Sequence, residues 1–451
     1  MQIKQFEDKN LAQFSYAVLS DCEKKIILID PARNTQPYLD YATENEAQIV
    51  GVIETHPHAD FVSSHLELHQ STGATIYTGK LVDALYPHQT FDEGDSIQVG
   101  KVKLSAIHTP GHSPDSISVL LEHNGKQKAV FTGDTLFIGD CGRPDLREGA
   151  GKIQSKREEL ARQMYHSLRE KLMTLNDDVV VYPAHGAGTL CGKNLSKESS
   201  SAIGREKQTN WSLQPVTEEE FVNNLLSDQP FIPHYFSFDV ELNRKGAAPL
   251  QESISKIKMS DSGNDAAGLD KALWIVDVRK EEHFKEGHLP HSINIMEDGK
   301  FETWLGSIIK PGEKFYLAGE SREQLQRMML RAAAIGYETA IAEALIVRDG
   351  PEKEAELDVN IFKEQKANYT IIDVRNTSEV KAGKIFPGSL PIPLAELRER
   401  VAEIPTNKPI VVHCAGGYRS AAASSLIHST LNEKARVFDL SDAVKNFMKT
   451  S

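Results

Sequence analysis

The sequence predicts a layered α/β protein made of three domains. The chain has 451 residues, and domains have roughly 150 residues each, so about three hydrophobic cores are expected. From the N-terminus to about residue 183, short β-rich runs such as KKIILIDP and AQIVGVIET recur, with helical stretches between some of them. Beyond residue 250 the sequence repeats itself, which indicates one α/β domain followed by two copies of another.

The repeat is centred on an Asp-Val-Arg motif. LWIVDVRKEEHFKEG around Asp277 returns as TIIDVRNTSEVKAG around Asp373, 96 positions later. Each copy has a strand, the motif, a helical turn, a glycine, a proline, a second strand and a helix, a βαβ pattern that predicts a parallel sheet. We therefore expect domains at residues 1–250, 251–350 and 351–451.

The composition is that of an ordinary globular chain, 40% hydrophobic and 25% charged. Lys and Arg number 51 and Asp and Glu number 64, which gives a net charge of -13. Because a negative protein repels the phosphate backbone, we expect no nucleic-acid partner. No run approaches the roughly 18 apolar residues of a bilayer span, and the N-terminus has no basic stretch before an apolar one. The four cysteines form no CxxC pair, which favours free thiols, a cytoplasmic location and no membrane partner.

Histidine and aspartate residues follow four of the β-rich runs of the first domain. The motifs are THPHAD at residues 55–60, TPGH ending at residue 112, FTGD ending at residue 134 and YPAH ending at residue 185. Imidazole and carboxylate groups that converge from several strand ends suit a divalent metal ion. The candidate site residues are His56, His58, Asp60, His112, Asp134 and His185.

This series of motifs resembles the metallo-β-lactamase superfamily over roughly residues 1–210, which implies an N-terminal αββα sandwich. The dinuclear hydrolases of that superfamily have HxHxDH as their first motif, and its last histidine belongs to the second metal. Here that position is Phe61, which cannot coordinate a cation. The resemblance therefore implies one metal ion rather than two.

Within the superfamily, the pattern is most similar to the persulfide dioxygenases. That resemblance implies one Fe(II) per chain on His56, His112 and Asp134, with open positions for a substrate sulfur and dioxygen. His58, Asp60 and His185 would then orient ligands or hold water, with His58 as an alternative fourth ligand. His65 and His69, one helical turn apart, are expected on a solvated helix face.

The segment GDCGRPD at residues 139–145 resembles the CGRxD segment of persulfide dioxygenases. Arg143 either pairs with an anionic persulfide or sulfinate, or braces the loop through Asp145. Cys191, six residues after His185 in a glycine-rich loop, either relays sulfur as a catalytic thiol or fills a turn. The sequence leaves both pairs of alternatives open.

A second candidate site is the cysteine loop of the last domain. The strand ending at His413 runs into Cys414-Ala-Gly-Gly-Tyr-Arg419, and a helix is expected from Ser420. Backbone N–H groups of such a loop, a helix N-terminus and a guanidinium stabilise a thiolate or a persulfide anion. The loop and Asp-Val-Arg motif resemble the rhodanese sulfurtransferases over residues 355–451, which implies catalytic Cys414 and Arg419. The substrate-binding loop residues would be Ala415, Gly416, Gly417 and Tyr418.

The first copy lacks this nucleophile. The repeat distance places Ala318 opposite Cys414, and residues 251–350 contain no cysteine. We expect an inactive rhodanese copy that serves for spacing, interface formation or substrate docking, or that is a structural remnant. Its residues His283, His288 and His291 are expected at the surface.

The order of the three domains resembles the CstB-type fusion of a persulfide dioxygenase with sulfurtransferase domains. The resemblance implies oxidation of a low-molecular-weight thiol persulfide by O2 to sulfite, rhodanese transfer of sulfur to give thiosulfate, and no organic cofactor. The physiological role would be detoxification of sulfide and persulfide. A homo-oligomer is expected. Two alternatives stay open: a zinc thioesterase of the glyoxalase II type fused to rhodanese domains, and a non-enzymatic sulfur carrier or sensor.

Overall fold

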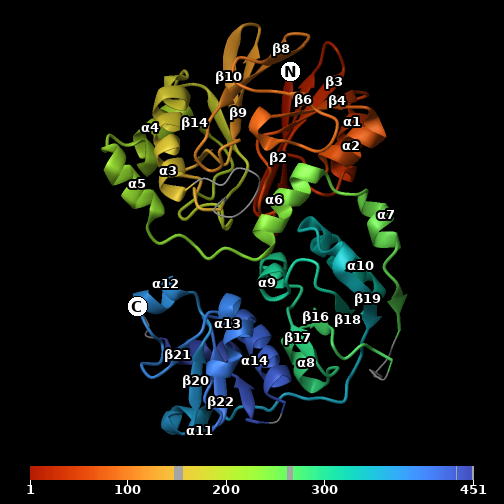
Figure 1. Cartoon of the computed structure of the whole chain (residues 1–451), viewed down its shortest axis with the longest axis vertical. Coiled ribbons are helices and arrows are strands. Elements are labelled where there is room, and N and C mark those ends of the chain that lie inside the picture. The colour runs from red at the N-terminus through yellow and green to blue at the C-terminus, as the bar shows by residue number, and fades with distance from the viewer. Residues whose placement is uncertain (147–155, 262–267, 433, 449–451) are drawn as a thin grey trace. The chain divides into compact units, whose positions relative to one another are not determined.

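The structure is a computed structural model that describes residues 1–146, 156–261, 268–432 and 434–448 (Figure 1). The chain divides into two compact units. The first comprises Met1–Glu252 together with Ala333–Gly336, and the second comprises Ser253–Ala332 and Tyr337–Ser451. Within the described ranges, no helix is both long and apolar enough to cross a membrane.

Two six-stranded sheets form the frame of the first unit. The first sheet has the order β1-β2-β3-β4-β5-β6, antiparallel from β1 to β3 and parallel from β3 to β6. Its strands are β1 (Gln2–Asp8), β2 (Gln13–Ser20), β3 (Lys25–Ile29), β4 (Gln48–Glu54), β5 (Thr75–Thr78) and β6 (Gln89–Thr90). The second sheet has the order β14-β13-β10-β9-β8-β7. Its strands are β7 (Ser96–Val99), β8 (Val102–His108), β9 (Ile117–His123), β10 (Lys126–Gly133), β13 (Val180–Pro183) and β14 (Ser201–Ala202), and β11 (Leu136–Phe137) forms a separate hairpin with β12 (Asp140–Cys141).

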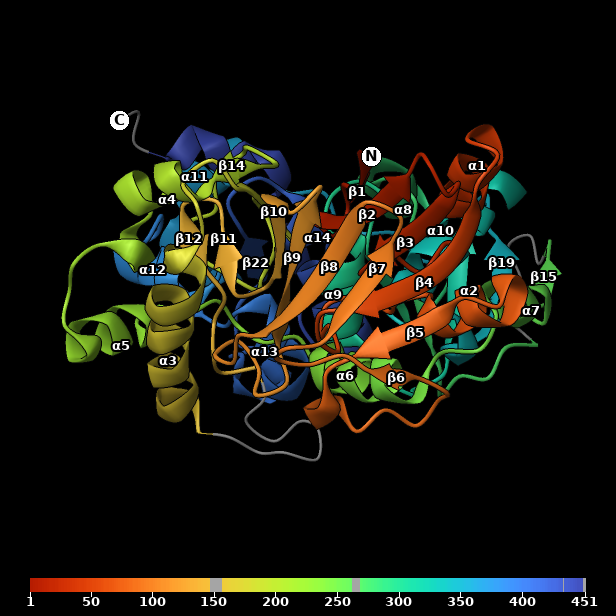
Figure 2. The same cartoon turned by 90° about the horizontal axis from the view of Figure 1, so that it is seen from above.

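Helices cover the outer faces of both sheets (Figure 2). They are α1 (Gln36–Glu44), α2 (His65–Thr72), α3 (Arg157–His166), α4 (Ile203–Thr209) and α5 (Glu218–Leu226). Helix α6 (Tyr235–Lys245) instead packs on the loop after β4, and α7 (Leu250–Ser255) leads into the second unit. A capping box between Thr217 and Glu220 starts α5, and Gly73, at φ 74°, ends α2 in the left-handed conformation that glycine adopts without strain.

Three apolar cores separate these layers. Ile29 and Phe131 belong to the core between the two sheets, Tyr38 to the core beneath α1 and α2, and Phe221 to the core beneath α3 and α5. The strands between helix and sheet are therefore buried on both faces, and β2 is buried at every position. This layering confirms the expected αββα sandwich.

The second unit holds two parallel sheets, which confirms the expected α/β copies. The first copy has a five-stranded sheet in the order β15-β19-β18-β16-β17. Its elements are β15 (Met259–Ser260), β16 (Trp274–Asp277), α8 (Glu281–Glu286), β17 (Ser292–Asn294), α9 (Phe301–Ile308), β18 (Phe315–Gly319), α10 (Arg322–Ala334) and β19 (Ile341–Ile346).

The second copy has a four-stranded sheet in the order β21-β20-β22-β23. Its elements are α11 (Val359–Glu364), β20 (Thr370–Asp373), α12 (Thr377–Ala382), β21 (Leu390–Pro391), α13 (Leu394–Arg400), β22 (Ile410–His413), α14 (Tyr418–Leu431) and β23 (Val437–Asp439). Helix α14 packs against the edge strand β17 of the first copy. There the Asn294 N–H donates to Ser425 Oγ at 2.9 Å, so the two copies share a hydrogen-bonded joint.

Candidate functional site

Side chains at the ends of four strands meet in the first unit. His56 follows β4, His112 follows β8, Asp134 directly follows β10 and His185 follows β13. One ligand atom each of His56, His112 and Asp134 lies within 4.8 Å of the other two, and all three residues are buried. The structure thus brings together the three residues that the sequence predicted as metal ligands.

The geometry of this triad fits a bound cation. Asp134 Oδ2 lies 3.8 Å from His56 Nε2 and 3.5 Å from His112 Nε2. His56 Nε2 and Asp134 Oδ2 are buried, and no described residue forms a hydrogen bond with either atom. Buried polar atoms without partners are rare and costly, and a divalent metal ion would satisfy both of them.

The protonation states suit metal binding as well. Burial lowers the pKa of His56 well below its ordinary value and also lowers that of His112, so both imidazoles are neutral at pH 7. Burial opposes ionisation of Asp134, but the neighbouring His185 outweighs it and holds the pKa of that carboxyl well below its usual range. Two neutral imidazoles and a carboxylate are the forms that ligate a metal.

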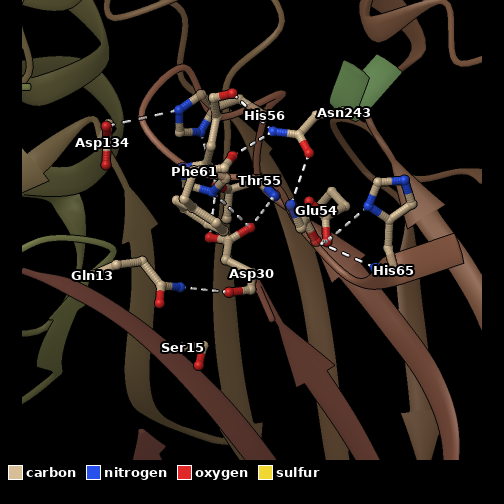
Figure 3. A network of polar contacts seen from close by, with 12 residues as sticks. Gln13, Ser15, Asp30, Glu54, Thr55, His56, Phe61, His65, Asp134 and Asn243 are labelled. Atoms are coloured by element: carbon tan, nitrogen blue, oxygen red, sulfur yellow. Dashed lines mark hydrogen bonds and ion pairs between the residues drawn. The ribbon is translucent and has the colours of Figure 1, made fainter. Parts of the chain in front are cut away.

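A hydrogen-bond chain orients His56 (Figure 3). Thr55 Oγ1 donates to Asp30 Oδ2 at 2.8 Å and lies 3.0 Å from His56 Nδ1. Because the Thr55 hydroxyl gives its proton to Asp30, it accepts the Nδ1 proton and leaves the Nε2 lone pair toward Asp134. Sequence reasoning missed Asp30, although an acidic residue directly after the buried strand β3 was the signal that could have found it.

His58, Asp60 and His185 form a second buried group beside the triad, also with ligand atoms within 4.8 Å of one another. His185 Nδ1 lies 2.7 Å from Asp134 Oδ1, and its Nε2 lies 3.0 Å from Asp60 Oδ2. Burial favours the neutral imidazole, but the two carboxylates outweigh it and raise the pKa of His185 well above its ordinary value. A protonated His185 holds Asp134 in place and has no lone pair for a metal.

Phe61 closes the other side of this second group. Its buried ring lies 4.3 Å from the ring of His58 and 6.1 Å from that of His185, measured between ring centroids. Asn243 on α6 fixes the same loop, because its Nδ2 donates to the carbonyls of His58 at 2.9 Å and Phe61 at 2.7 Å. No sequence pattern points to Asn243, which lies far from the motif along the chain.

His65 departs from the sequence prediction. It was expected on a solvated face, but it is fully buried, with its ring 4.4 Å from Tyr86 and its Nδ1 3.7 Å from Glu54 Oε1. Burial lowers its pKa to about 3. The prediction was wrong because His65 lies on the inner face of α2, which packs against β4. His69 is half-buried, with Nδ1 2.8 Å from the Ala74 carbonyl oxygen.

The loop after β12 packs against the triad without offering a free charge. Arg143 is buried and makes two 2.7 Å contacts with Asp145, through Nε and Nη2, and Nη1 donates to the Leu190 carbonyl at 3.2 Å. This geometry favours the bracing role of Arg143 over substrate binding. Gly142 is sterically locked, since a Cβ there would lie 1.9 Å from the Asp134 carbonyl oxygen and 3.0 Å from His112 Nδ1.

Cys191 lies beside the triad. Its Sγ is within 4.8 Å of ligand atoms of Asp134 and His185, and the Arg143 N–H donates to its carbonyl at 3.0 Å. Burial raises the pKa of the Cys191 thiol well above its ordinary value, with the charges of Asp60 and Asp134 adding to the effect. The thiol is therefore protonated in this state, which suits a packed side chain better than a nucleophile.

The cysteine loop of the second copy forms an anion cradle. Cys414 follows β22 and is buried, and its Sγ accepts hydrogen bonds from the N–H groups of Gly416 at 3.4 Å and Gly417 at 3.1 Å. The N-terminus of α14 begins at Tyr418, two residues before the expected start. Gly417 has φ 106°, a backbone conformation that favours glycine.

Two other predicted loop residues also make contacts outside the loop. Arg419 interacts with the Cys414 side chain and with Glu379. Arg419 pairs with Glu379 through Nη1 at 2.5 Å and Nη2 at 2.9 Å, and burial, which would lower its pKa, is outweighed by Glu379 so that the pKa is raised. The Tyr418 hydroxyl donates to the carbonyl of Met296 in the first copy at 2.9 Å. The Tyr418 side chain therefore joins the two copies.

The family comparisons agree with this architecture. The model of the metallo-beta-lactamase superfamily matches residues 10–185, and the model of the rhodanese-like domain matches residues 259–343 and 356–450. A metallo-beta-lactamase structure from Staphylococcus aureus subsp. aureus COL is 33% identical, with a TM-score of 0.69 over 76% of this chain and 99% of that one.

Curated relatives of two kinds match the first unit. The mitochondrial persulfide dioxygenase ETHE1 of Homo sapiens is 31% identical over 174 residues, which are 38% of this chain and 63% of that protein. A probable hydroxyacylglutathione hydrolase of Schizosaccharomyces pombe (strain 972 / ATCC 24843) is 30% identical over 244 residues, 48% of this chain and 89% of that protein. The chain belongs to the metallo-β-lactamase superfamily and carries tandem rhodanese-like domains, the architecture of a persulfide dioxygenase/sulfurtransferase fusion.

Proposed function

We propose that the chain is an iron-dependent persulfide dioxygenase coupled to rhodanese sulfur transfer. One observation carries the proposal: His56, His112 and Asp134 form a buried ligand set, whereas Phe61 and the ion pairs of His185 block the neighbouring group. The similarity to ETHE1 supports the same reaction. Overall, R-S-S⁻, O2 and H2O would give R-SH and HSO3⁻.

His56, His112 and Asp134 would hold the iron. When bound, Fe(II) supplies open coordination positions at which a persulfide sulfur and dioxygen are activated together. The surrounding residues hold these ligands in place. Asp30 and Thr55 fix the ring of His56, and His185 engages Asp134 Oδ1 while leaving Oδ2 directed at the triad.

Cys414 would carry out the second reaction. Its thiolate attacks the terminal sulfur of a persulfide R-S-SH, forms a new S–S bond and releases R-SH. The resulting Cys-S-S⁻ gives its outer sulfur to sulfite, which yields thiosulfate and restores the thiolate. The N–H groups of Gly416 and Gly417 already donate to Sγ, so they can stabilise negative charge on the cysteine in both states.

A zinc thioesterase is the second candidate. The similarity to a probable hydroxyacylglutathione hydrolase favours it, as do the convergent ligand atoms of His58, Asp60 and His185. Such a reaction needs a metal-bound hydroxide near the second group. The Phe61 ring and the double ion pairing of His185 weigh against that arrangement.

The test is oxygen uptake by anaerobically purified, iron-loaded protein supplied with a small-thiol persulfide. We expect uptake with formation of sulfite or thiosulfate, and a loss of at least about 100-fold in His112→Ala because a ligand is missing. His69→Ala, outside the triad, is the matched control and should retain uptake. No uptake by protein with verified bound iron would contradict the dioxygenase, and thioester cleavage by zinc-loaded protein would then establish the second candidate.

A further inference from the structure

Three metal-ligating side chains meet at the joint between the two rhodanese copies. His288 lies in the first copy between α8 and β17, Glu352 lies in the segment that connects the copies, and His428 lies in the last turn of α14. One ligand atom of each residue lies within 4.8 Å of the other two. This cluster belongs to neither site described above.

His288 was expected at the surface, but it is 1% exposed. Its ring stacks on Phe284, with centroids 4.0 Å apart and planes 7° from parallel. Its Nδ1 lies 2.9 Å from the Phe284 carbonyl oxygen, which can only accept, so Nδ1 carries the proton and Nε2 carries the lone pair. The surface prediction was wrong because the connecting segment and α14 cover this histidine.

The Nε2 atom faces groups that cannot satisfy it. It is buried, and the described part of the chain offers it no hydrogen bond. Glu352 Oε2 lies 3.7 Å away and is itself an acceptor. Two lone-pair atoms that face each other in this way call for a cation between them.

The spacing is close to that of a coordination site. An ion with tetrahedral bonds of about 2.0–2.1 Å holds its ligand atoms about 3.3 Å apart. The 3.7 Å separation of Glu352 and His288 is near this value, and the ring of His428 stands edge-on to that of His288 with centroids 6.3 Å apart. The Phe284 carbonyl that fixes the His288 tautomer is a typical partner of a metal-binding histidine.

The backbone holds the two anchoring residues in register. His288 N–H donates to the Glu352 carbonyl at 2.9 Å, and Glu352 N–H donates back to the His288 carbonyl at 3.2 Å. Gly350 lies so close that a Cβ there would be 2.1 Å from the His288 carbonyl carbon and oxygen. The site is therefore preorganised by main-chain contacts rather than by long side chains alone.

An ion can reach the cluster from solvent. A cavity of about 810 Å³ adjoins it, lined by residues of both copies and of the connecting segment. Glu352 and His428 are among the lining residues, so their side chains are accessible while His288 forms the buried end of the site.

We propose that His288, Glu352 and His428 bind a divalent transition metal ion, Zn²⁺, which ties the connecting segment and helix α14 to the first rhodanese copy. Two imidazoles and one carboxylate are a common zinc ligand set, and the cavity lined by Glu352 and His428 has room for water as a fourth ligand. The inference is independent of the reaction proposed for the first unit. It gives the copy without a cysteine a role of its own.

The first test measures zinc content. Full-length protein, Glu352→Gln and His428→Ala are dialysed against the same micromolar Zn²⁺ solution and analysed by mass spectrometry of the metal. We expect each variant to hold about one Zn²⁺ fewer per chain than the unaltered protein. His291→Ala is the matched control, because His291 lines the same cavity but stacks on Trp274 at 3.8 Å and should keep the full zinc content.

A second comparison separates the two metal sites. His112→Ala should lose a different equivalent, and the double variant His112→Ala/His428→Ala should lose both. Zn²⁺ should raise the thermal midpoint of the unaltered protein more than that of His428→Ala, while in excess chelator the two midpoints should agree, which also shows that the variant folds. Equal zinc content in the unaltered protein, Glu352→Gln and His428→Ala would overturn the proposal, whatever the result for His112→Ala.

Discussion

The two rhodanese copies have the same frame and differ at one loop. In the first copy, Arg279 Nη2 pairs with Asp277 Oδ2 at 2.7 Å and donates to the Gly287 carbonyl at 2.9 Å. In the second copy, Arg375 Nη2 makes the same two contacts, with Asp373 at 2.7 Å and the Gly383 carbonyl at 2.9 Å. The Asp-Val-Arg motif is therefore a structural element that both copies need, with or without chemistry.

The difference lies after the strand that pairs with this motif. In the first copy only Glu320 and Ser321 separate β18 from α10, whereas in the second copy residues 414–417 separate β22 from α14 and cradle the sulfur. The strand register pairs Asp277 with Ala318 but Asp373 with His413. The residue equivalent to Cys414 is thus Gly319, not Ala318, because the first copy has one more residue between its paired strands. Loop length, and not the frame, distinguishes the copy that carries Cys414 from the copy that has no cysteine.

The most severe way to break this comparison is Cys414→Ser. Sulfur transfer should fall on the order of 10³-fold or more, because the hydroxyl cannot form the persulfide anion. Thiosulfate formation from persulfide and sulfite measures the effect. Oxygen uptake with supplied persulfide should persist. The reciprocal Gly319→Cys should gain no transfer, since only two loop residues follow it and the Glu320 N–H already donates to Gln324 Oε1. Parallel loss of both activities in Cys414→Ser would refute two separate sites.

The shared frame can be tested by a matched pair, Asp277→Asn and Asp373→Asn. Each leaves a buried arginine without its carboxylate, so each should reduce the free energy of unfolding by about 3–5 kcal/mol in urea denaturation. Asp261→Asn is the control, because its pair with Arg348 is exposed and should contribute less than about 1 kcal/mol. Only Asp373→Asn should also slow sulfur transfer, since Asp373 pairs with the residue before Cys414. A large loss of unfolding free energy in only one of the two variants would show that the Asp-Val-Arg frames are not equivalent.

The entry segments of the two copies predict a smaller, pH-dependent difference. Lys258 is exposed and pairs with Glu343 at 3.0 Å, whereas its counterpart Glu354 has a buried Oε1. Burial, helped by the nearby Asp439, raises the pKa of Glu354 to about 8. The stabilisation from protonated Glu354 is complete below its ordinary pKa of 4.5 and is lost as pH rises toward about 8.

Glu354→Gln should therefore be more stable than the unaltered protein at pH 8, on the order of 1 kcal/mol, and no more stable at pH 4. Urea denaturation at both pH values measures the difference. The exposed Glu356→Gln serves as control and should show no such crossover. A pH-independent effect of Glu354→Gln would mean that the carboxyl does not titrate in this range.

The sequence predicted features that depend on local order along the chain. The layers, the parallel sheets and the repeat follow from strand periodicity and the Asp-Val-Arg motif, and the fold confirms them. The histidines at strand ends are brought together because the C-terminal end of β4 in the first sheet meets those of β8, β10 and β13 in the second.

The sequence could not predict which partner each polar side chain selects. Asp30 and Asn243 support the first site from distant segments, and Tyr418 turns from its own loop to Met296. His65 and His288 are buried, although the polar residues around them in the sequence predicted exposure. These choices depend on tertiary packing, so no pattern of residue spacing encodes them.

Gly142 has a practical consequence for engineering the first unit. A library that randomises the loop from Cys141 to Asp145 in search of new substrates should return glycine at position 142 in every active clone, because any larger residue collides with the Asp134 backbone. Diversity introduced there would mostly produce proteins in which Asp134 is displaced. Libraries that leave Gly142 fixed would place their variation where the chain can accept it.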